Sequence, residues 1–259
     1  MTENWVGISI VLLLLGGLIG ALRIYKSRFD PHPEVVRKLL HVGMGLTSLT
    51  FPWLFDDYWP IIILVGVTTP GLYLTRHLKS LKTLCGGVID GVGREQSLGE
   101  VYYPLGVATA FILSQGQPVL YCIPILLLTF ADTAAALVGR LFGAIHYRIW
   151  DEVKSVEGSA TFFVAAFFSI ELALHFLTGI HGVERILIAT LVAVIVMLVE
   201  AVAVRGLDNL LIPMVGFFLI NYFIVLDQAE LVRWLFMLCL TTVVVFIYYQ
   251  AQRTGEYYV

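Results

Sequence analysis

The sequence predicts an all-α fold: a polytopic bundle of transmembrane helices forming a single integral-membrane domain over residues 1–259. Hydrophobic residues make up 59% of the chain and charged residues only 14%, whereas about 25% charged residues is usual in soluble domains. Mean hydropathy is +0.88. Apolar segments recur along the whole length, and no polar stretch between them is long enough to build a core of its own.

The number of spans follows from the length of these apolar segments. A helix needs about 20 residues to cross a hydrocarbon core about 30 Å thick. The fourth segment is short, so the expectation is about nine spans, or eight if that segment crosses only in part. The segments lie at residues 5–24, 36–55, 59–77, 101–114, 118–139, 160–179, 185–204, 208–226 and 230–249.

The loop charges predict the orientation of the bundle. Of the 16 Lys and Arg residues, all but Arg185 and Arg233 fall at the odd-numbered loops or after the last segment. Cytoplasmic loops carry such an excess of positive charge, so the N-terminus is expected outside and the C-terminus in the cytoplasm. The first segment follows Glu3 and precedes its basic residues, which favours an uncleaved first helix over a cleavable signal.

This topology places every polar cluster on the cytoplasmic face, where one site can gather them. A transporter would more often carry charges near the midplane and show inverted repeats, and no internal repeat is evident. A net charge of −3 gives no footprint for nucleic acid. Three scattered cysteines, Cys85, Cys122 and Cys239, indicate apolar fillers and no disulfide or zinc framework.

The second segment opens with a basic cluster. Arg37 and His41 are four residues apart and share one helix face, which Gly45 continues, and Lys38 lies beside them. A cation and an imidazole on one face are suited to lining a cleft for an anionic substrate. Alternatively, Arg37 and Lys38 extend to lipid headgroups, as interfacial basic residues do.

The loop after the third segment is rich in glycine but carries no nucleotide-binding motif of the Walker A type. Gly86, Gly87 and Gly91 make it flexible, and no Gly-Lys pair occurs anywhere in the chain. Glu100 opens the fourth segment. It can bind a ligand there, or it can simply complement the helix dipole.

The fifth segment carries a carboxylate, Asp132, inside apolar sequence. A charged side chain at the centre of a bilayer helix costs about 2.5–3.5 kcal/mol, so a functional role is the default expectation. Gly139 lies on the same helix face seven residues later, followed by Arg140. A metal or nucleotide contact fits this arrangement best, and a structural ion pair with Lys or Arg is the alternative.

The run from Lys154 to Ser159 is the most specific one in the sequence. It combines an ammonium group, the hydroxyls of Ser155 and Ser159, and Gly158, which allows close backbone approach, at the mouth of a helix. Glu157 is a candidate ligand for Mg²⁺, which binds phosphates with help from one or two carboxylates. A simply capped helix start is the alternative, although it does not need the lysine.

The seventh segment ends in a further polar cluster. Glu200 lies within the apolar portion, and Asp208 with Asn209 begins the eighth segment. The Asp-Asn pair is also what an ordinary helix N-cap contains. Glu200 has no such structural explanation.

Together these motifs resemble the family of CTP-dependent lipid-alcohol kinases, which includes phytol kinase, dolichol kinase and CTP-dependent diacylglycerol kinase. The resemblance spans roughly residues 34–216, and its most specific part is the Lys-Ser-x-Glu-Gly-Ser run. The kinase family is itself distantly similar to CDP-diacylglycerol synthase, but the longer acidic signature of that synthase is not evident in this chain. The residues that carry the resemblance to the kinase family are Arg37, Lys38, His41, Gly45, Gly99, Glu100, Tyr103, Pro104, Asp132, Thr133, Ala134, Ala135, Gly139, Arg140, Lys154, Ser155, Glu157, Gly158, Ser159, Glu200, Asp208 and Asn209.

The resemblance implies a kinase that moves the γ-phosphate of CTP, with Mg²⁺, to the hydroxyl of an isoprenoid alcohol such as phytol or a polyprenol. The magnesium ligands are then expected to be Asp132 and Glu157, and the catalytic base is one of His41, Glu200 and Asp208. Phosphate clamps are expected at Arg37, Arg140 and Lys154, hydrogen bonds to phosphate or ribose at Ser155, Ser159 and Asn209, and further nucleotide contacts at Lys38, Glu100, Gly139 and Gly158.

Two alternatives stay open at this point. One is a cytidylyltransferase that makes a CDP-lipid from phosphatidate, and the other is a membrane transporter of the same topology. The sequence leaves open which alcohol is used, whether another nucleotide replaces CTP, and the oligomeric state. The membrane is expected to be the bacterial inner membrane or that of an organelle, plastid or endoplasmic reticulum.

Overall fold

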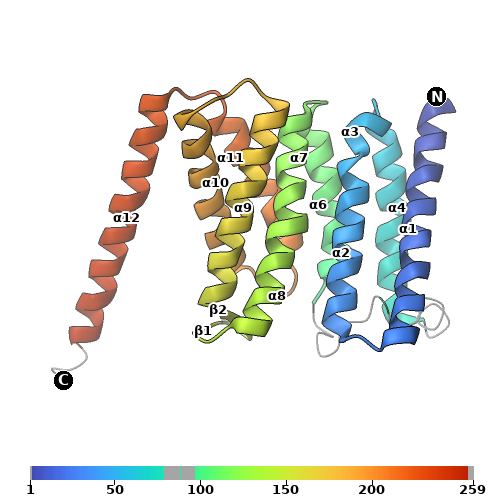
Figure 1. Ribbon diagram of the computed structural model, residues 1–259, viewed down its shortest axis with the longest axis horizontal. Helices are drawn as coiled ribbons and strands as arrows, with labels where there is room; N and C mark the ends of the chain where they lie inside the picture. Colours follow the sequence, from blue (N-terminus) through green and yellow to red (C-terminus); the bar gives the residue numbers. More distant parts are fainter. Residues whose placement is uncertain (1, 79–87, 89–96, 256–259) are drawn as a thin grey trace.

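The computed structural model describes residues 2–78, 88 and 97–255, and this part of the chain is a bundle of long helices (Figure 1). Each of the nine predicted apolar segments falls on a helix, with α3 a short continuation of α2. The helices are α1 (Thr2–Phe29), α2 (Pro33–Leu49), α3 (Phe51–Leu54), α4 (Trp59–His77), α6 (Gly99–Ser114), α7 (Pro118–Leu126), η1 (Leu127–Ala131), α8 (Asp132–Phe142), α9 (Val156–Leu177), α10 (Val183–Val202), α11 (Asp208–Phe223) and α12 (Gln228–Gly255).

Five helical stretches of the described residues are long and apolar enough to cross a membrane. They are Glu3–Phe29, Pro118–Phe142, Val156–Leu177, Val183–Val202 and Gln228–Tyr248. Apart from the outermost one, these helices run side by side, and the start of α1 and the end of α12 lie at opposite ends of the helices (Figure 1). The prediction of a multi-pass helical membrane protein is therefore confirmed.

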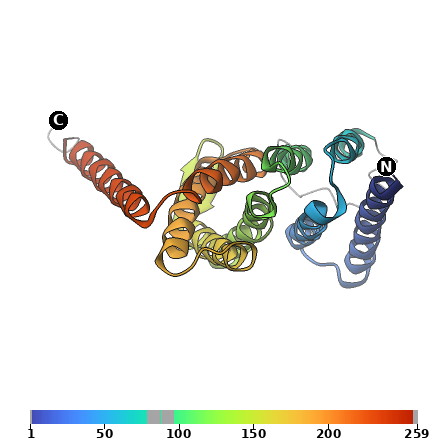
Figure 2. The ribbon, with the colours of Figure 1, turned by 90° about the horizontal axis from the view of Figure 1, so that it is seen from above.

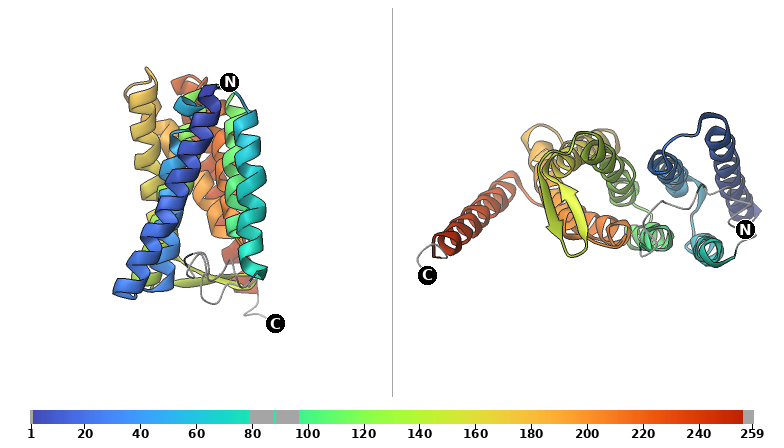
Figure 3. Two further views of the ribbon diagram at one scale, coloured as in Figure 1. Left: turned by 90° about the vertical axis from the view of Figure 1, so that its right-hand side faces the viewer. Right: turned by 90° about the horizontal axis from the view of Figure 1, so that it is seen from below.

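The expectation of a purely helical fold is corrected at one place. The polar loop before α9 is an antiparallel hairpin of β1 (His146–Ile149) and β2 (Glu152–Ser155), with Ile149 opposite Glu152. Trp150, in the two-residue turn between the strands, has a φ of 51°, the left-handed conformation that such tight hairpin turns require. The hairpin lies across the end of the helices (Figure 3).

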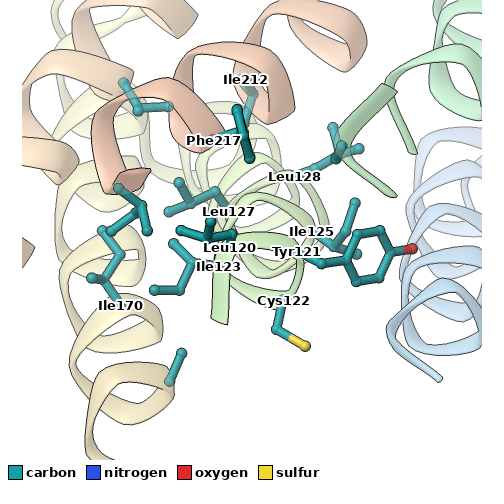
Figure 4. Packing of buried hydrophobic residues seen from close by; sticks show 14 of the residues in the cluster. Leu120, Tyr121, Cys122, Ile123, Ile125, Leu127, Leu128, Ile170, Ile212 and Phe217 are labelled. Atoms are coloured by element: carbon teal, nitrogen blue, oxygen red, sulfur yellow. The ribbon is translucent and has the colours of Figure 1, made fainter. Parts of the chain in front are cut away.

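The centre of the core is the continuous stretch α7–η1–α8. Its upper half is apolar on every side, and Tyr121, Ile123, Ile125 and Leu127 are almost completely buried (Figure 4). A helix that is apolar all round is one that neighbours surround. Here α6, α9, α11 and α2 pack against it, so this stretch fixes where Asp132 lies.

The helices at the two edges of the molecule are less enclosed. On one side α1, α2 and α4 form a group beside α6, and on the other α12 leans away from the bundle and packs mainly on α10 (Figures 1 and 2). The predicted glycine-rich loop falls on residues 79–96, which, apart from Val88, lie outside the described residues.

Candidate functional site

A polar cavity of about 450 Å³ lies at the end of the bundle that carries the hairpin. Seven elements meet around it: the first turns of α2 and α11, the face of α8, strands β1 and β2, the start of α9 and the end of α10. Its lining consists of Glu34, Arg37, Lys38, Ser97, Asp132, Ala135, Ala136, Gly139, Arg140, His146, Glu152, Val153, Lys154, Ser155, Gly158, Ser159, Glu200, Gly206, Asp208 and Asn209.

The innermost part of the cavity is built around Asp132. Lys38 Nζ lies 2.7 Å from Asp132 Oδ2, and His41 Nε2 lies 3.4 Å from the same oxygen. All three side chains are buried, with exposures of 3% for Lys38, 6% for Asp132 and 5% for His41. Burial of this kind requires pairing, so Lys38 does not extend to lipid headgroups, and the ion pair considered for Asp132 exists.

The tautomer of His41 follows from its second contact. Nε2 lies 2.8 Å from the carbonyl oxygen of Leu128, which can only accept a hydrogen bond. We therefore assign the proton to Nε2, which leaves Nδ1 as the nitrogen of the neutral ring that can accept a proton.

A π-helical turn explains why Asp132 and Leu128 face α2 together. The five residues of η1 widen the helix immediately before α8, and such π-bulges are frequent at functional sites. Asp132 is the first residue of α8. The wider turn offers the Leu128 carbonyl to His41 while the carboxylate of Asp132 faces Lys38.

A second ion pair spans the cavity between strand β2 and helix α10. Lys154 Nζ lies 2.8 Å from Glu200 Oε1 and also donates to the Glu200 carbonyl oxygen. The hairpin makes this possible, because strand β2 carries Lys154 across to the end of α10. The sequence predicted both residues in one site, and the structure brings them into direct contact.

The start of α9 is a capped helix that also borders the cavity. Ser155 is the N-cap, and its hydroxyl accepts from the amide of Gly158 at 3.1 Å. A Cβ added to Gly158 would lie 3.1 Å from the Ala135 carbonyl oxygen and 3.3 Å from Gly139 Cα. Both glycines therefore let α8 and α9 approach closely, and the Ser159 hydroxyl contacts that of Tyr147 at 2.6 Å.

The turn between α10 and α11 carries Asp208 and Asn209 to the cavity. Gly206 has a φ of 84° and lies so close to Gly99 that a Cβ would sit 2.4 Å from its amide nitrogen, so only glycine fits there. Asn209 Nδ2 donates to the Gly99 carbonyl oxygen at 3.0 Å. Among the described residues Asn209 Oδ1 has no hydrogen-bond partner, although it is buried in the lining.

The outer part of the cavity holds two arginines. Arg37 pairs with Glu34 on the same helix at 2.6 Å, and Arg140 Nη1 lies 2.9 Å from His32 Nδ1. Arg140 is exposed and Arg37 is half-buried. Their guanidinium groups face a space large enough for the phosphates of a nucleotide.

Three predicted site residues do not line the cavity. The Glu157 carboxylate accepts a hydrogen bond from the Ile145 amide at 3.1 Å, so it stabilises the loop before the hairpin. Glu100 lies in the first turn of α6, outside the lining. His41 contacts Asp132 but does not itself line the cavity. The predicted N-cap role of Asp208 is also replaced, because the cap position is Leu207.

Among the charged, polar and glycine residues of the lining, five were not predicted as site residues from the sequence: Glu34, Ser97, His146, Glu152 and Gly206. Glu152 accepts from the Arg205 amide at 2.6 Å and so ties the hairpin to the α10–α11 turn. The glycine between Arg205 and the Asp-Asn pair was the one available signal, since a glycine before a helix start indicates a tight turn.

The charges of the lining decide whether a metal ion fits. Five carboxylates (Glu34, Asp132, Glu152, Glu200, Asp208) face four cations (Arg37, Lys38, Arg140, Lys154). Without a counter-ion this slightly negative surface would repel a triphosphate. In the described part of the chain no three His, Cys, Asp or Glu side chains form a metal cluster, but Mg²⁺ needs only one or two carboxylates beside the phosphates and water. The residues therefore fit a magnesium–nucleotide complex.

Two relatives align with this chain. It is 29% identical over 213 residues to a phytol kinase of Synechocystis sp., an alignment that covers 81% of the chain and 88% of that relative. It is 31% identical over 144 residues to CTP-dependent diacylglycerol kinase 1 of Eremothecium gossypii, covering 52% of the chain and 44% of that relative.

No protein-family model matches the chain, and no solved structure matches it. Both relatives carry the names of kinases that act on lipid alcohols, and they confirm the resemblance drawn from the motifs.

Proposed function

We propose that the protein is a CTP-dependent lipid kinase that transfers the γ-phosphate of CTP to the hydroxyl of a membrane isoprenoid alcohol. The products are the lipid monophosphate and CDP. The observation that carries the proposal is the buried Lys38–Asp132–His41 cluster at the inner end of a polar cavity that is also lined by Lys154, Arg37 and Arg140. The similarity to phytol kinase over most of both chains supports the same activity.

The cations of the cavity are proposed to hold the triphosphate. Lys154, Arg37 and Arg140 line the space from three different elements, as expected for a clamp around a chain of phosphates. Two of them have carboxylate partners, Glu200 and Glu34, that hold them in position before the nucleotide arrives. Phosphoryl transfer depends mainly on such positioning and on charge neutralisation.

Magnesium is proposed to be held by Asp132 together with Asp208. Both carboxylates line the cavity and lie within electrostatic range of one another, whereas Glu157, the other predicted ligand, is engaged outside the lining. When bound, the ion neutralises charge on the phosphate oxygens of the nucleotide. The negative balance of the lining makes this contribution necessary for binding.

Asn209 is proposed to contact the nucleoside rather than the phosphates. Its buried Oδ1 lacks a partner among the described residues and can only accept a hydrogen bond. Phosphate oxygens at neutral pH are themselves acceptors. The partner of Asn209 is therefore proposed to be a hydrogen-bond donor, either a ribose hydroxyl or the amino group of cytosine. Of the two partners expected from the sequence, this excludes phosphate and keeps ribose.

The transfer step needs one base. The alcohol oxygen forms a bond to the γ-phosphorus, the bond from that phosphorus to the β,γ-bridging oxygen breaks, and the alcohol proton moves to a protein group. Of the three predicted bases, Glu200 already accepts from Lys154, and Asp208 is proposed as a metal ligand. His41 is the remaining candidate: its Nε2 contacts the Leu128 carbonyl oxygen, so we assign the proton to Nδ1, from an alcohol that reaches His41 from outside the polar cavity.

The membrane arrangement of this proposal keeps the sequence-based topology. Nine crossings with the N-terminus outside would place the hairpin and the cavity on the cytoplasmic side, where CTP is found. The start of α1 and the end of α12 lie at opposite ends of the helices, which supports an odd number of crossings (Figure 1). The host membrane is proposed to be a bacterial inner membrane or an organelle membrane.

A substrate panel tests the proposal. Purified protein in detergent is incubated with γ-labelled CTP and Mg²⁺ in the presence of phytol, farnesol, a polyprenol or diacylglycerol. Label in an isoprenoid monophosphate supports the proposal, and removal of Mg²⁺ with a chelator should abolish the transfer. Label in diacylglycerol alone would contradict the isoprenoid assignment. Absence of turnover with any nucleotide would favour the transporter alternative.

A further inference from the structure

A second cavity, of about 380 Å³, lies between α1, α2, α4 and α6. Its lining is almost entirely aliphatic and aromatic. The hydroxyls of Thr47, Ser48 and Thr68 donate to carbonyl oxygens of their own helices at 2.7–2.9 Å. These groups are therefore satisfied internally, and the cavity offers a hydrocarbon-like surface, which we call the apolar groove.

The groove is long and narrow because of how the helices pair. Helix α1 packs on α2 and α4 packs on α6, whereas α2 makes few contacts with α4 or α6. Its lining runs along α2 and into α3, from Leu40 to Phe51, which at about 1.5 Å per residue is roughly 16 Å. Gly16 of α1 and Gly71 of α4 leave open space on its walls. Figure 2 shows the four helices arranged around this region.

The apolar groove and the polar cavity meet at one boundary. On α2, Lys38 lines the polar cavity and Leu40 lines the groove. His41 connects the two cavities. Its ring packs edge-on against Tyr103 of the groove, with ring centroids 4.9 Å apart, and its Nε2 lies 3.4 Å from Asp132 of the polar cavity. A group at the Tyr103 end of the groove is therefore one side chain away from the Asp132 cluster.

The Tyr103 hydroxyl is the second observation. Tyr103 is 3% exposed and lines the groove, and its hydroxyl lies close to the hydroxyls of Ser48 and Thr129. Buried polar atoms are nearly always paired. These hydroxyls give the otherwise hydrocarbon-like groove one polar end, which fits a ligand with a long apolar chain and one terminal hydroxyl.

We infer that the apolar groove binds the isoprenoid tail of the alcohol, with its hydroxyl end at Tyr103 and His41, facing the Asp132 cluster. This rests on the proposed kinase function and names the site of its lipid substrate. A phospholipid of the bilayer fits less well, because its charged headgroup would meet buried Tyr103, and the nearby cation Lys38 is already paired with Asp132.

A photo-crosslinking experiment tests the inference without relying on turnover. The purified protein is irradiated with an isoprenoid alcohol analogue that carries a diazirine in its tail, and labelled peptides are identified by mass spectrometry. Label is expected on α1, α2, α4 and α6, and excess phytol should displace it. Label confined to α9–α12, or displacement by phosphatidylglycerol as effectively as by phytol, would overturn the inference.

Matched glycine variants locate the tail more sharply. Gly71→Leu and Gly16→Leu add side chains inside the groove, whereas Gly66→Leu and Gly20→Leu place the same change in open space on the same helices but outside the groove. The first pair should reduce labelling and raise KM for the alcohol about tenfold, with KM for CTP unchanged. Equal labelling in all four variants would contradict the inference.

Tyr103→Phe tests the hydroxyl end. It should weaken binding of the alcohol about tenfold, as expected for one buried hydrogen bond, and leave binding of the hydroxyl-free hydrocarbon phytane unchanged. A parallel loss for both compounds would show that Tyr103 acts only in packing and would overturn its assignment. Specific labelling without any phosphoryl transfer would instead retain the groove and refute the kinase.

Discussion

At the scale of single residues, the Lys38–Asp132 pair has both a structural and a chemical consequence. Breaking a buried ion pair by removing one partner leaves an uncompensated charge and costs about 3–5 kcal/mol. Asp132→Asn should therefore lower stability by that amount and abolish CTP turnover. Thermal unfolding and γ-phosphate transfer measure the two effects.

The double variant Lys38→Met/Asp132→Leu separates these consequences. Replacing both partners with apolar residues of similar size removes the unpaired charge, so most of the lost stability should return. Turnover should stay absent, because the proposed metal ligand is gone. A double variant with recovered turnover would reduce Asp132 to a structural role.

Lys154 is the second residue whose role can be isolated. Lys154→Ala should lower kcat/KM for CTP about 100-fold, as expected for loss of one preorganised donor to a transferring phosphate. Arg185→Ala is its matched control, since Arg185 of α10 also pairs with a carboxylate, Glu171 of α9, at 2.6 Å, but outside the cavity. Equal turnover in the two variants would remove Lys154 from the phosphate clamp.

The sequence indicated many of these residues but not their partners. A carboxylate in an apolar segment was enough to single out Asp132 and Glu200, because bilayer burial of a charge requires a reason. Helix periodicity cannot pair Lys38 with Asp132, which is 94 residues away. The position of Glu157 at a helix start suggested that it is a metal ligand. In the structure its carboxylate instead accepts a hydrogen bond from the Ile145 amide.

At the scale of elements, the close contact of α8 and α9 holds the two sides of the cavity together. Gly158→Val would push its side chain against the Ala135 carbonyl oxygen and Gly139. We expect a loss of about 1–3 kcal/mol in stability, typical of overpacking, together with reduced turnover. Gly179→Val is the control, since a Cβ at Gly179 meets nothing within 4 Å. Equal unfolding temperatures for both variants would argue against this contact.

Two elements at the site could not be predicted from the sequence. The hairpin was expected to be a polar loop because its strands have four residues each and its turn is Trp150-Asp151, without the Asn-Gly or Asp-Gly pair that marks such turns. The π-helical turn at Leu127–Ala131 has no sequence signature in a uniformly apolar stretch. Both elements are held by the tertiary packing around them. The apolar segments themselves were predicted well, since hydropathy alone decides them.

At the scale of the whole molecule, the orientation in the membrane is testable. In a variant lacking Cys85, Cys122 and Cys239, a single cysteine replaces His181 in the α9–α10 loop or Arg148 in the hairpin. A membrane-impermeant maleimide applied to intact bacterial cells with a permeable outer membrane should label His181→Cys. It should reach Arg148→Cys only after the inner membrane is permeabilised. The reverse pattern would invert the proposed topology.

The fate of both ends of the triphosphate shows whether this bundle transfers a phosphoryl group from CTP to a lipid alcohol. Purified protein is given CTP with distinguishable labels on its α- and γ-phosphates, with phytol and phosphatidate present together. A kinase places the γ-label in phytyl monophosphate and leaves the α-label in CDP. An α-label in the lipid with the γ-label in pyrophosphate would contradict the proposed kinase activity and identify a cytidylyltransferase.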